Sequence, residues 1–252
     1  MEKRRIHLID EIRGFAVICM VFHHSLLSIA EIFGSQFFMD AFNFLCVFQP
    51  IFWLLFFGVS GISSRLSGNN LKRGAQLFGI ALVITAITYA YFNGRATIVF
   101  GVLHFLAVSM MIFHFIKPLF GRINPIVGAV VCLLLFAFTY GIYDGYVGVF
   151  EFVKIELPRA LYKTKYLFWL GFPNVSFRSA DYFPLLPFIF LFFVGGFVGD
   201  YVQKGKLPSF AYNKHCGVLR FMGRHALITY IFHQPIIYAI CYLVKWIVSS
   251  IG

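Results

Sequence analysis

Apolar residues follow one another in long runs along this chain, and polar residues gather in the short stretches between the runs. A bilayer core about 30 Å thick needs roughly 20 apolar residues for one helical crossing. Seven runs reach or approach that length, so the pattern predicts an all-α polytopic membrane protein with about seven transmembrane helices. The predicted spans are 12–33, 42–62, 75–91, 98–116, 125–142, 183–202 and 226–248.

The connections between these spans differ in length and charge. Lys and Arg concentrate in the short connections that alternate onto one side, and short basic connections stay cytoplasmic. We therefore expect the N-terminus in the cytoplasm and the C-terminus outside. The one long connection, about 143–182, is then an outer loop, and its aromatic and basic residues suit the membrane interface. No linker or change of composition divides the chain, which predicts a single transmembrane domain over residues 1–252.

Composition supports the membrane class and limits the partners. Sixty per cent of the residues are hydrophobic and only 12% are charged, which is too apolar for a soluble domain of this size. We expect an integral, multi-pass protein in the lipid bilayer, in the cytoplasmic membrane if the chain is prokaryotic. The net charge of +11 comes mostly from Lys and Arg in the short connections predicted to be cytoplasmic, so no nucleic-acid partner is expected. The five cysteines show no paired or metal-like spacing.

The first span carries ionisable residues where its neighbours are apolar. Such groups are costly inside a membrane and usually mark a functional site or pathway. At about 100° per residue, Arg13 and His24 fall within about 20° of each other, and Asp10 lies about 40° from His24 on the same side. Asp10, Arg13 and His24 thus form one polar stripe, whereas His23 points elsewhere. We expect Arg13 at the cytoplasmic mouth and His24 about 16 Å further along the helix axis, near mid-membrane.

Three more polar residues could face the same cavity. They are His104 in the fourth span, His233 in the last span and Asp181 at the outer mouth of the sixth span. Each could equally be structural. Three intramembrane histidines could also bind a metal, but no carboxylate or cysteine lies at ligand spacing beside them, so no metal is expected.

Five stretches of the chain resemble, in order, the heparan-alpha-glucosaminide N-acetyltransferase catalytic-domain family, and most closely its short prokaryotic members. They read "IDEIRGFAVICMVFHH", "FWLLFFGVSGISSRLS", "FGVLHFLAVSMMIF", "DYFPLLPFIFLFFVGGFVGDY" and "LRFMGRHALITYIFHQPI". The wider superfamily of membrane acyltransferases shares an Arg followed by ten residues and His, which Arg13 and His24 match. It also shares a late Tyr-x-x-His-x-Pro, which Tyr230, His233 and Pro235 match.

The resemblance implies transfer of an acetyl group from cytoplasmic acetyl-CoA to a sugar or glycan acceptor on the far side. Arg13 would then help to hold the donor, and His24 would be the catalytic base or a transient acyl carrier. Asp10 could neutralise Arg13 when no donor is bound. The enzyme that names the family has Asn where His24 stands, so heparan itself is not expected as the substrate.

A donor with several phosphates would suit a basic inner mouth built from Arg13, Lys72, Arg73 and Arg224. Positive-inside bias alone would also place these residues there. Two other readings stay open: a small proton-coupled transporter with a histidine relay, and a non-catalytic scaffold. The acceptor, the acyl chain length, the choice between an acyl-His intermediate and direct transfer, and a homo-oligomer also stay open.

Overall fold

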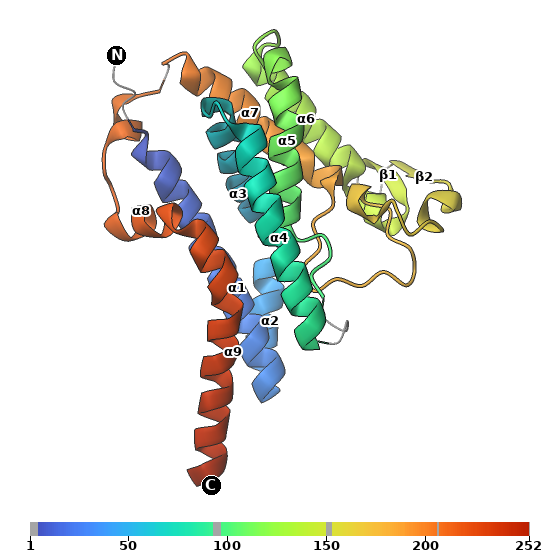
Figure 1. Cartoon of the computed structure of the whole chain (residues 1–252), viewed down its shortest axis with the longest axis vertical. Helices are drawn as coiled ribbons and strands as arrows, with labels where there is room; N and C mark the ends of the chain where they lie inside the picture. The colour runs from blue at the N-terminus through green and yellow to red at the C-terminus, as the bar shows by residue number, and fades with distance from the viewer. Residues whose placement is uncertain (1–4, 93–96, 150–152, 206, 252) are drawn as a thin grey trace. The chain divides into compact units, whose positions relative to one another are not determined.

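The computed structural model describes residues 5–92, 97–149, 153–205 and 207–251. Six helices in these ranges are long and apolar enough to cross a membrane, and a bent pair makes seven if it counts as one span. The predicted all-α polytopic membrane fold is confirmed. The six spans are α1 (His7–Phe33), α4 (Asn70–Phe92), α5 (Val102–Phe120), α6 (Pro125–Thr139) continued by a 3₁₀ turn to Asp144, α7 (Leu185–Gln203) and α9 (Ala226–Ile251) (Figure 1).

The second predicted span, 42–62, is broken into two helices in the structure. Residues 47 and 48 separate helix α2 (Gln36–Cys46) from α3 (Gln49–Leu66), and the axes of the two helices are inclined by 58°. The break precedes Pro50, which lies in the first turn of α3. Proline has no backbone N–H and fits a first helical turn, where that donor is not needed. A new helix therefore starts here.

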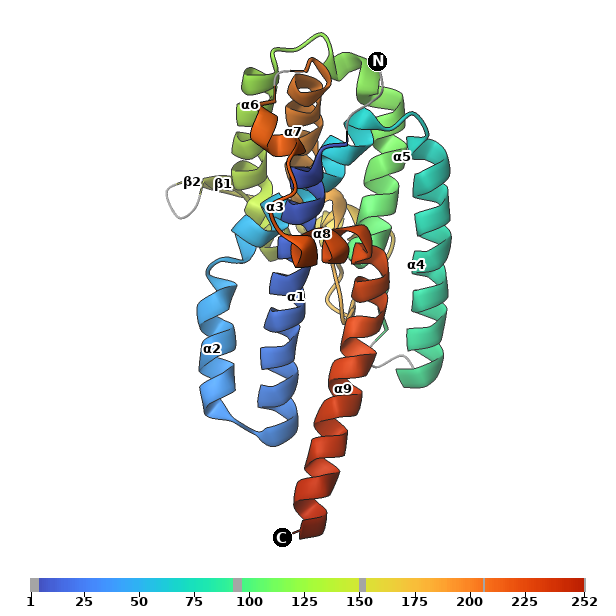
Figure 2. The ribbon, with the colours of Figure 1, turned by 90° about the vertical axis from the view of Figure 1, so that its left-hand side faces the viewer.

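The chain forms two compact units, which we call the terminal unit (Met1–Val59 with Leu207–Gly252) and the central unit (Ser60–Lys206). In the terminal unit, α1 packs against α2, α9 and the short helix α8 (Gly217–Arg224) (Figure 2). A 3₁₀ turn, η4 (Ser209–Tyr212), precedes α8. In the central unit, α4 packs on α5 and α6 packs on α7. The single-domain organisation stays a prediction.

Helix α8 contacts α1 backbone to backbone. A Cβ atom added to Gly14 would lie 1.9 Å from the carbonyl oxygen of Leu219, and one added to Gly223 would lie 1.8 Å from that of Asp10. Only glycine permits this approach, because any side chain would have to occupy the space of a main-chain atom.

A buried carboxylate fixes the segment that leads into α8. One oxygen of Glu11, which is 4% exposed, accepts hydrogen bonds from the backbone N–H groups of His215 (2.9 Å) and Cys216 (3.0 Å). Arg220 adds an ion pair to the same oxygen at 3.7 Å. Glu11 and the two glycines together hold α8 against the first turns of α1.

The central unit is held at one end by an ion-pair network that we call the Asp200 cluster. Arg65 donates to a carboxylate oxygen of Asp200 and, at 2.8 Å, to the carbonyl of Lys117 near the end of α5. Lys204 pairs with the other oxygen of Asp200 at 2.8 Å. Lys117 in turn donates to the carbonyl of Ser67 at 2.7 Å. Cations that bind the last carbonyls of a helix are stabilising, so this cluster ties the ends of α3, α5 and α7 together.

The connection 143–182 contains a hairpin that was not predicted. After η1 (Tyr140–Asp144), strand β1 (Tyr146–Val149) pairs antiparallel with β2 (Val153–Glu156), and two 3₁₀ turns follow, η2 (Arg159–Tyr162) and η3 (Phe168–Leu170). Residues 150–152 of the predicted loop lie outside the described residues.

Candidate active site

Two histidines from opposite ends of the sequence meet in the terminal unit. His24 of α1 and His233 of α9 have ring centroids 5.1 Å apart, and the ring planes are inclined by 54°. His233 is only 9% exposed. The sequence contains these residues 209 positions apart, and the packing of α9 on α1 brings them together.

The hydrogen bonds of His233 define its tautomer. Its Nδ1 lies 2.7 Å from the carbonyl oxygen of Tyr230, one turn earlier in α9. Because a carbonyl only accepts, Nδ1 carries the proton and the neutral ring has its lone pair on Nε2. That Nε2 is buried and has no hydrogen-bond partner among the described residues. The site therefore contains an oriented imidazole nitrogen that can accept a proton.

His23, the neighbour of His24 in the sequence, lies in a different environment. Its Nε2 is 3.1 Å from the side-chain nitrogen of Gln49 and 3.5 Å from the sulfur of Cys46. Its ring centroid is 4.4 Å from that of Phe42. His23 thus fills the space beside the break between α2 and α3, whereas His24 faces His233.

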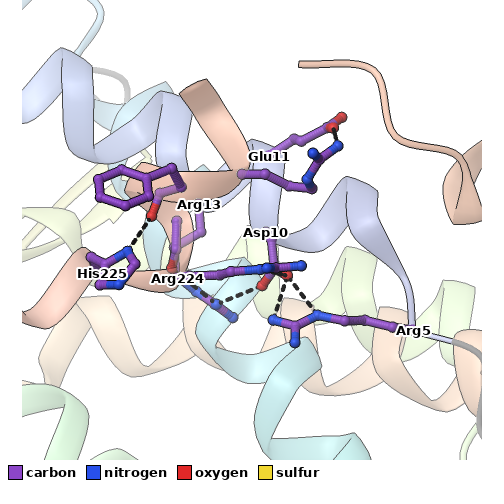
Figure 3. Close-up of polar contacts among 9 residues, drawn as sticks. Arg5, Asp10, Glu11, Arg13, Arg224 and His225 are labelled. Atoms are coloured by element: carbon purple, nitrogen blue, oxygen red, sulfur yellow. Dashed lines mark hydrogen bonds and ion pairs between the residues drawn. The ribbon is translucent and has the colours of Figure 1, made fainter. Parts of the chain in front are cut away.

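Asp10 lies at the centre of an arginine cluster near the start of α1, which we call the Asp10 cluster (Figure 3). Arg5 donates to one carboxylate oxygen from Nη2 (2.8 Å) and Nε (3.0 Å), and Arg224 approaches the same oxygen to 3.7 Å. Arg13 donates to the other oxygen at 3.3 Å and to the carbonyl of Gly223 at 3.4 Å. Three guanidinium groups thus share one carboxylate.

The charges of the Asp10 cluster do not cancel, and its arginines reach solvent. The side chain of Asp10 is 9% exposed, but those of Arg5 and Arg224 are 58% and 41% exposed. Guanidinium groups bind phosphate and carboxylate oxygens with geometric preference. The cluster also lies at the N-terminal end of α1, where the helix dipole favours an anion. The arrangement can therefore bind an anionic ligand.

The family model for heparan-alpha-glucosaminide N-acetyltransferase, catalytic, matches residues 5–235 of the 252. The chain belongs to this family. No curated protein and no solved structure matches the chain. The matched range contains both the Asp10 cluster and the histidine pair. Family membership and the apolar helices together identify an integral, multi-pass membrane acetyltransferase.

The remaining predicted site residues of this family member, His104, Asp181 and Arg73, belong to the central unit. The ring of His104 stacks on Phe100 at 5.7 Å and contacts Phe78 edge to face at 5.8 Å. Its Nε2 lies 3.3 Å from the hydroxyl oxygen of Thr85, and that hydroxyl donates to the carbonyl of Ile98 at 2.6 Å. Because the Thr85 hydroxyl proton goes to the carbonyl of Ile98, Nε2 of His104 is the donor in the bond between His104 and Thr85.

Asp181 and Arg73 lie at helix starts. The carboxylate of Asp181 accepts a hydrogen bond from the backbone N–H of Val102, the first residue of α5, at 3.0 Å. This contact caps α5 with a residue from the connection that leads to α7. Arg73 lies exposed in the first turn of α4.

Sequence reasoning missed two contributors to the site. One is Arg5, whose only signal in the sequence is its position five residues before Asp10. The other is Glu11, a carboxylate directly before the predicted first span, where an ionisable residue is itself unusual. Among the described residues, no group of three or more His, Cys, Asp and Glu side chains is arranged to hold a metal.

Proposed function

We propose that this membrane acetyltransferase moves the acetyl group of acetyl-CoA, bound from the cytoplasmic side, to a hydroxyl or amine of a carbohydrate acceptor on the outer side. The observation that carries the proposal is the buried, unpartnered Nε2 of His233 against the ring of His24. The same unit holds the exposed Asp10 cluster, which suits an anionic donor.

The donor's phosphates bind the arginines of the Asp10 cluster in this proposal. Arg13 and Arg224, with the newly found Arg5, bind phosphate oxygens, and Asp10 holds the guanidinium groups near one another when no donor is present. Arg73 lies in the central unit, and its role as a phosphate ligand stays a prediction. Arg13 and His24 are eleven residues apart, or about 16 Å along α1, a separation that the long pantetheine arm of acetyl-CoA can cover.

The chemical step uses the two imidazoles in different roles. The acceptor oxygen or nitrogen attacks the thioester carbonyl carbon while its proton passes to Nε2 of His233. An N–H of His24 donates to the carbonyl oxygen as negative charge develops there. The carbon–sulfur bond then breaks, and the thiolate takes the proton from His233 and leaves as free CoA. In the alternative, His24 itself accepts the acetyl group before the acceptor does.

His104 and Asp181 act at a distance in this proposal. Their contacts fix the start of α5 and the segment 97–102. We propose that they hold this segment of the central unit in place and take no part in proton transfer. The sidedness rests on the basic short connections, which stay cytoplasmic.

The test measures acetyl-CoA consumption by the full-length protein in lipid nanodiscs. Radiolabelled acetyl-CoA and a mixed sugar pool are supplied, and free CoA, labelled sugar and labelled protein are quantified for wild type, His24→Ala and His233→Ala. Loss of a general base lowers turnover by about 10²–10⁴-fold. The matched control is His23→Ala, adjacent in sequence but facing Gln49, which we expect to stay within a few-fold of wild type.

The outcomes separate the alternatives. Label retained on wild-type protein and lost in His24→Ala would favour the acyl-His route over direct transfer. Full activity of His233→Ala would refute its role as base. A folded wild-type protein that neither binds nor consumes acetyl-CoA with any sugar would refute the proposed donor and favour the transporter reading.

A further inference from the structure

The segment from Arg159 to Arg178 has an unusual composition. Its sequence, "RALYKTKYLFWLGFPNVSFR", contains four cations and six aromatic residues but no Asp or Glu. It lies in the long connection between α6 and α7, and it has no role in the proposed acetyl transfer.

The segment is an ordered structure with its own core. The hydroxyl of Tyr162 donates to the carbonyl of Ile142, and the hydroxyl of Tyr182 donates to the carbonyl of Phe168. The rings of Phe168 and Phe177 stack with centroids 5.1 Å apart. Burial raises the pKa of Tyr182, so its hydroxyl stays protonated and keeps donating.

Other side chains of the segment are exposed, and several of them are cationic or aromatic. We call those from Arg159 to Trp169 the basic–aromatic face. Tyr166 is 81% exposed, and Trp169 is 38% exposed although Trp is normally much more buried. The exposed cations of the face are Arg159, Lys163 and Lys165.

The face lies next to the ends of two membrane spans. Gly171, which follows Trp169 closely, packs against the first turn of α7: a Cβ atom on it would lie 2.9 Å from the carbonyl oxygen of Leu186. The same added Cβ atom would lie 3.0 Å from the side chain of Ile142, in the η1 turn that follows α6. A segment packed on the terminal turn of a spanning helix lies at the level of the lipid headgroups.

We propose that the basic–aromatic face binds the headgroup phosphates of anionic phospholipids. Trp and Tyr favour the interface because one end of each ring system is apolar and the other is polar. Lys and Arg at this level attract anionic lipids. The absence of any carboxylate between Arg159 and Arg178 leaves that attraction unopposed within the segment. A water-soluble polyanion would be attracted by the cations alone and gives no reason for Tyr166 and Trp169 to be exposed.

The experiment uses fluorescence of Trp169 in the full-length protein, with Trp53→Phe and Trp246→Phe as background. The protein is placed in nanodiscs of phosphatidylcholine with increasing fractions of brominated phosphatidylglycerol or brominated phosphatidylcholine. We expect both brominated lipids to quench Trp169 and phosphatidylglycerol to quench it at lower mole fraction. Removing a cation from such a surface weakens lipid preference by about fivefold. Lys163→Gln with Lys165→Gln should therefore lower the preference for phosphatidylglycerol by at least that factor.

The control is Lys154→Gln, which removes one positive charge from the same connection but on β2, over the ring of Tyr146, and it is compared with the single variant Lys163→Gln. An equal loss of preference in this control would show a non-specific charge effect and overturn the proposal. No quenching by either lipid would also overturn it, as would equal quenching by both. A response to soluble dextran sulfate without lipid quenching would assign the face to a polyanionic glycan instead. None of these readouts depends on acetyl transfer.

Discussion

The Asp10 and Asp200 clusters are built from the same groups, a carboxylate with arginine and a further cation, but they differ in burial. Arg65 and Asp200 have side chains only 11% and 3% exposed, and Arg65 also donates to the carbonyl of Lys117. Around Asp10, Arg5 and Arg224 are about half exposed. Identical chemistry therefore gives a closed structural clamp in one unit and an open cationic surface in the other.

The difference indicates how to recognise a binding cluster. In the Asp200 cluster, both terminal nitrogens of Arg65 donate to fixed acceptors of the protein, and the guanidinium is too buried to meet a ligand. In the Asp10 cluster, three guanidinium groups supply many more donors than one carboxylate can accept. Surplus donors that reach solvent are what an anionic donor substrate needs. The number of charges alone does not distinguish the two.

The largest effect is expected for Asp200→Ala. This substitution leaves the guanidinium of Arg65 buried without its carboxylate, which costs about 3–5 kcal/mol in free energy of unfolding. An SDS titration from mixed micelles, followed by loss of helical circular dichroism, measures it. The control replaces both partners, Arg65→Met with Asp200→Leu, and should recover most of the loss. If Asp200→Ala alone were as stable as wild type, the Asp200 cluster would not be a structural cluster, and its contrast with the Asp10 cluster would be wrong.

A somewhat smaller effect is expected for Gly223→Ala. The new methyl group would lie within 2 Å of the Asp10 carbonyl oxygen, so α8 has to move away from α1. Overpacking of this kind costs roughly 1–3 kcal/mol. Because Arg224 follows directly, the Michaelis constant for acetyl-CoA should also rise. Gly217→Ala, in the same helix with nothing within 4 Å of the added carbon, should leave both quantities unchanged.

Arg5→Gln and Arg224→Gln should affect binding and leave stability nearly intact. Surface ion pairs contribute at most about 1 kcal/mol. A charge-assisted hydrogen bond to a phosphate contributes enough to change affinity by about tenfold. We expect the Michaelis constant for acetyl-CoA to rise about tenfold and to depend less on salt concentration than in wild type. An unchanged constant in both variants would contradict the assignment of the Asp10 cluster to the donor.

The smallest effect is expected for Lys204→Gln. Lys204 is half exposed, and Arg65 already satisfies one oxygen of Asp200. The free energy of unfolding should fall by less than about 1 kcal/mol. The same SDS titration compares it with Asp200→Ala. A loss as large as that of Asp200→Ala would mean that Lys204, rather than Arg65, is the important partner.

Much of the membrane fold could be predicted from the sequence, because each span must satisfy its own backbone hydrogen bonds and therefore appears as one long apolar run. The stripe of Asp10, Arg13 and His24 follows from the helical repeat in the same way. The break between α2 and α3 falls at Gln49 and Pro50, which interrupt the apolar run, but these two residues do not predict the 58° bend. A proline alone does not distinguish a kink from a restart.

The features that the sequence did not predict depend on contacts between distant segments. Helix α8 is only eight residues long, and its place on α1 depends on Gly14, Gly223 and Glu11. None of these is informative without its partner. The β1–β2 hairpin was also not predictable from the sequence, because its two four-residue strands are too short to be distinguished from an aromatic loop. His24 and His233 were both chosen, but the free nitrogen of His233 follows from one hydrogen bond to Tyr230 that only the structure contains.

The contact between Gly14 and Gly223 also bears on the entropy of donor binding. A ligand that has to assemble its own binding groups loses affinity through the freedom those groups give up. Here the backbones that carry Arg13 and Arg224 are already in contact, so binding immobilises side-chain ends but no helix. The two glycines therefore act as a preorganising device. With the donor bound as proposed, they would raise its affinity without touching it, and a calorimetric comparison would find their contribution in the entropy of binding.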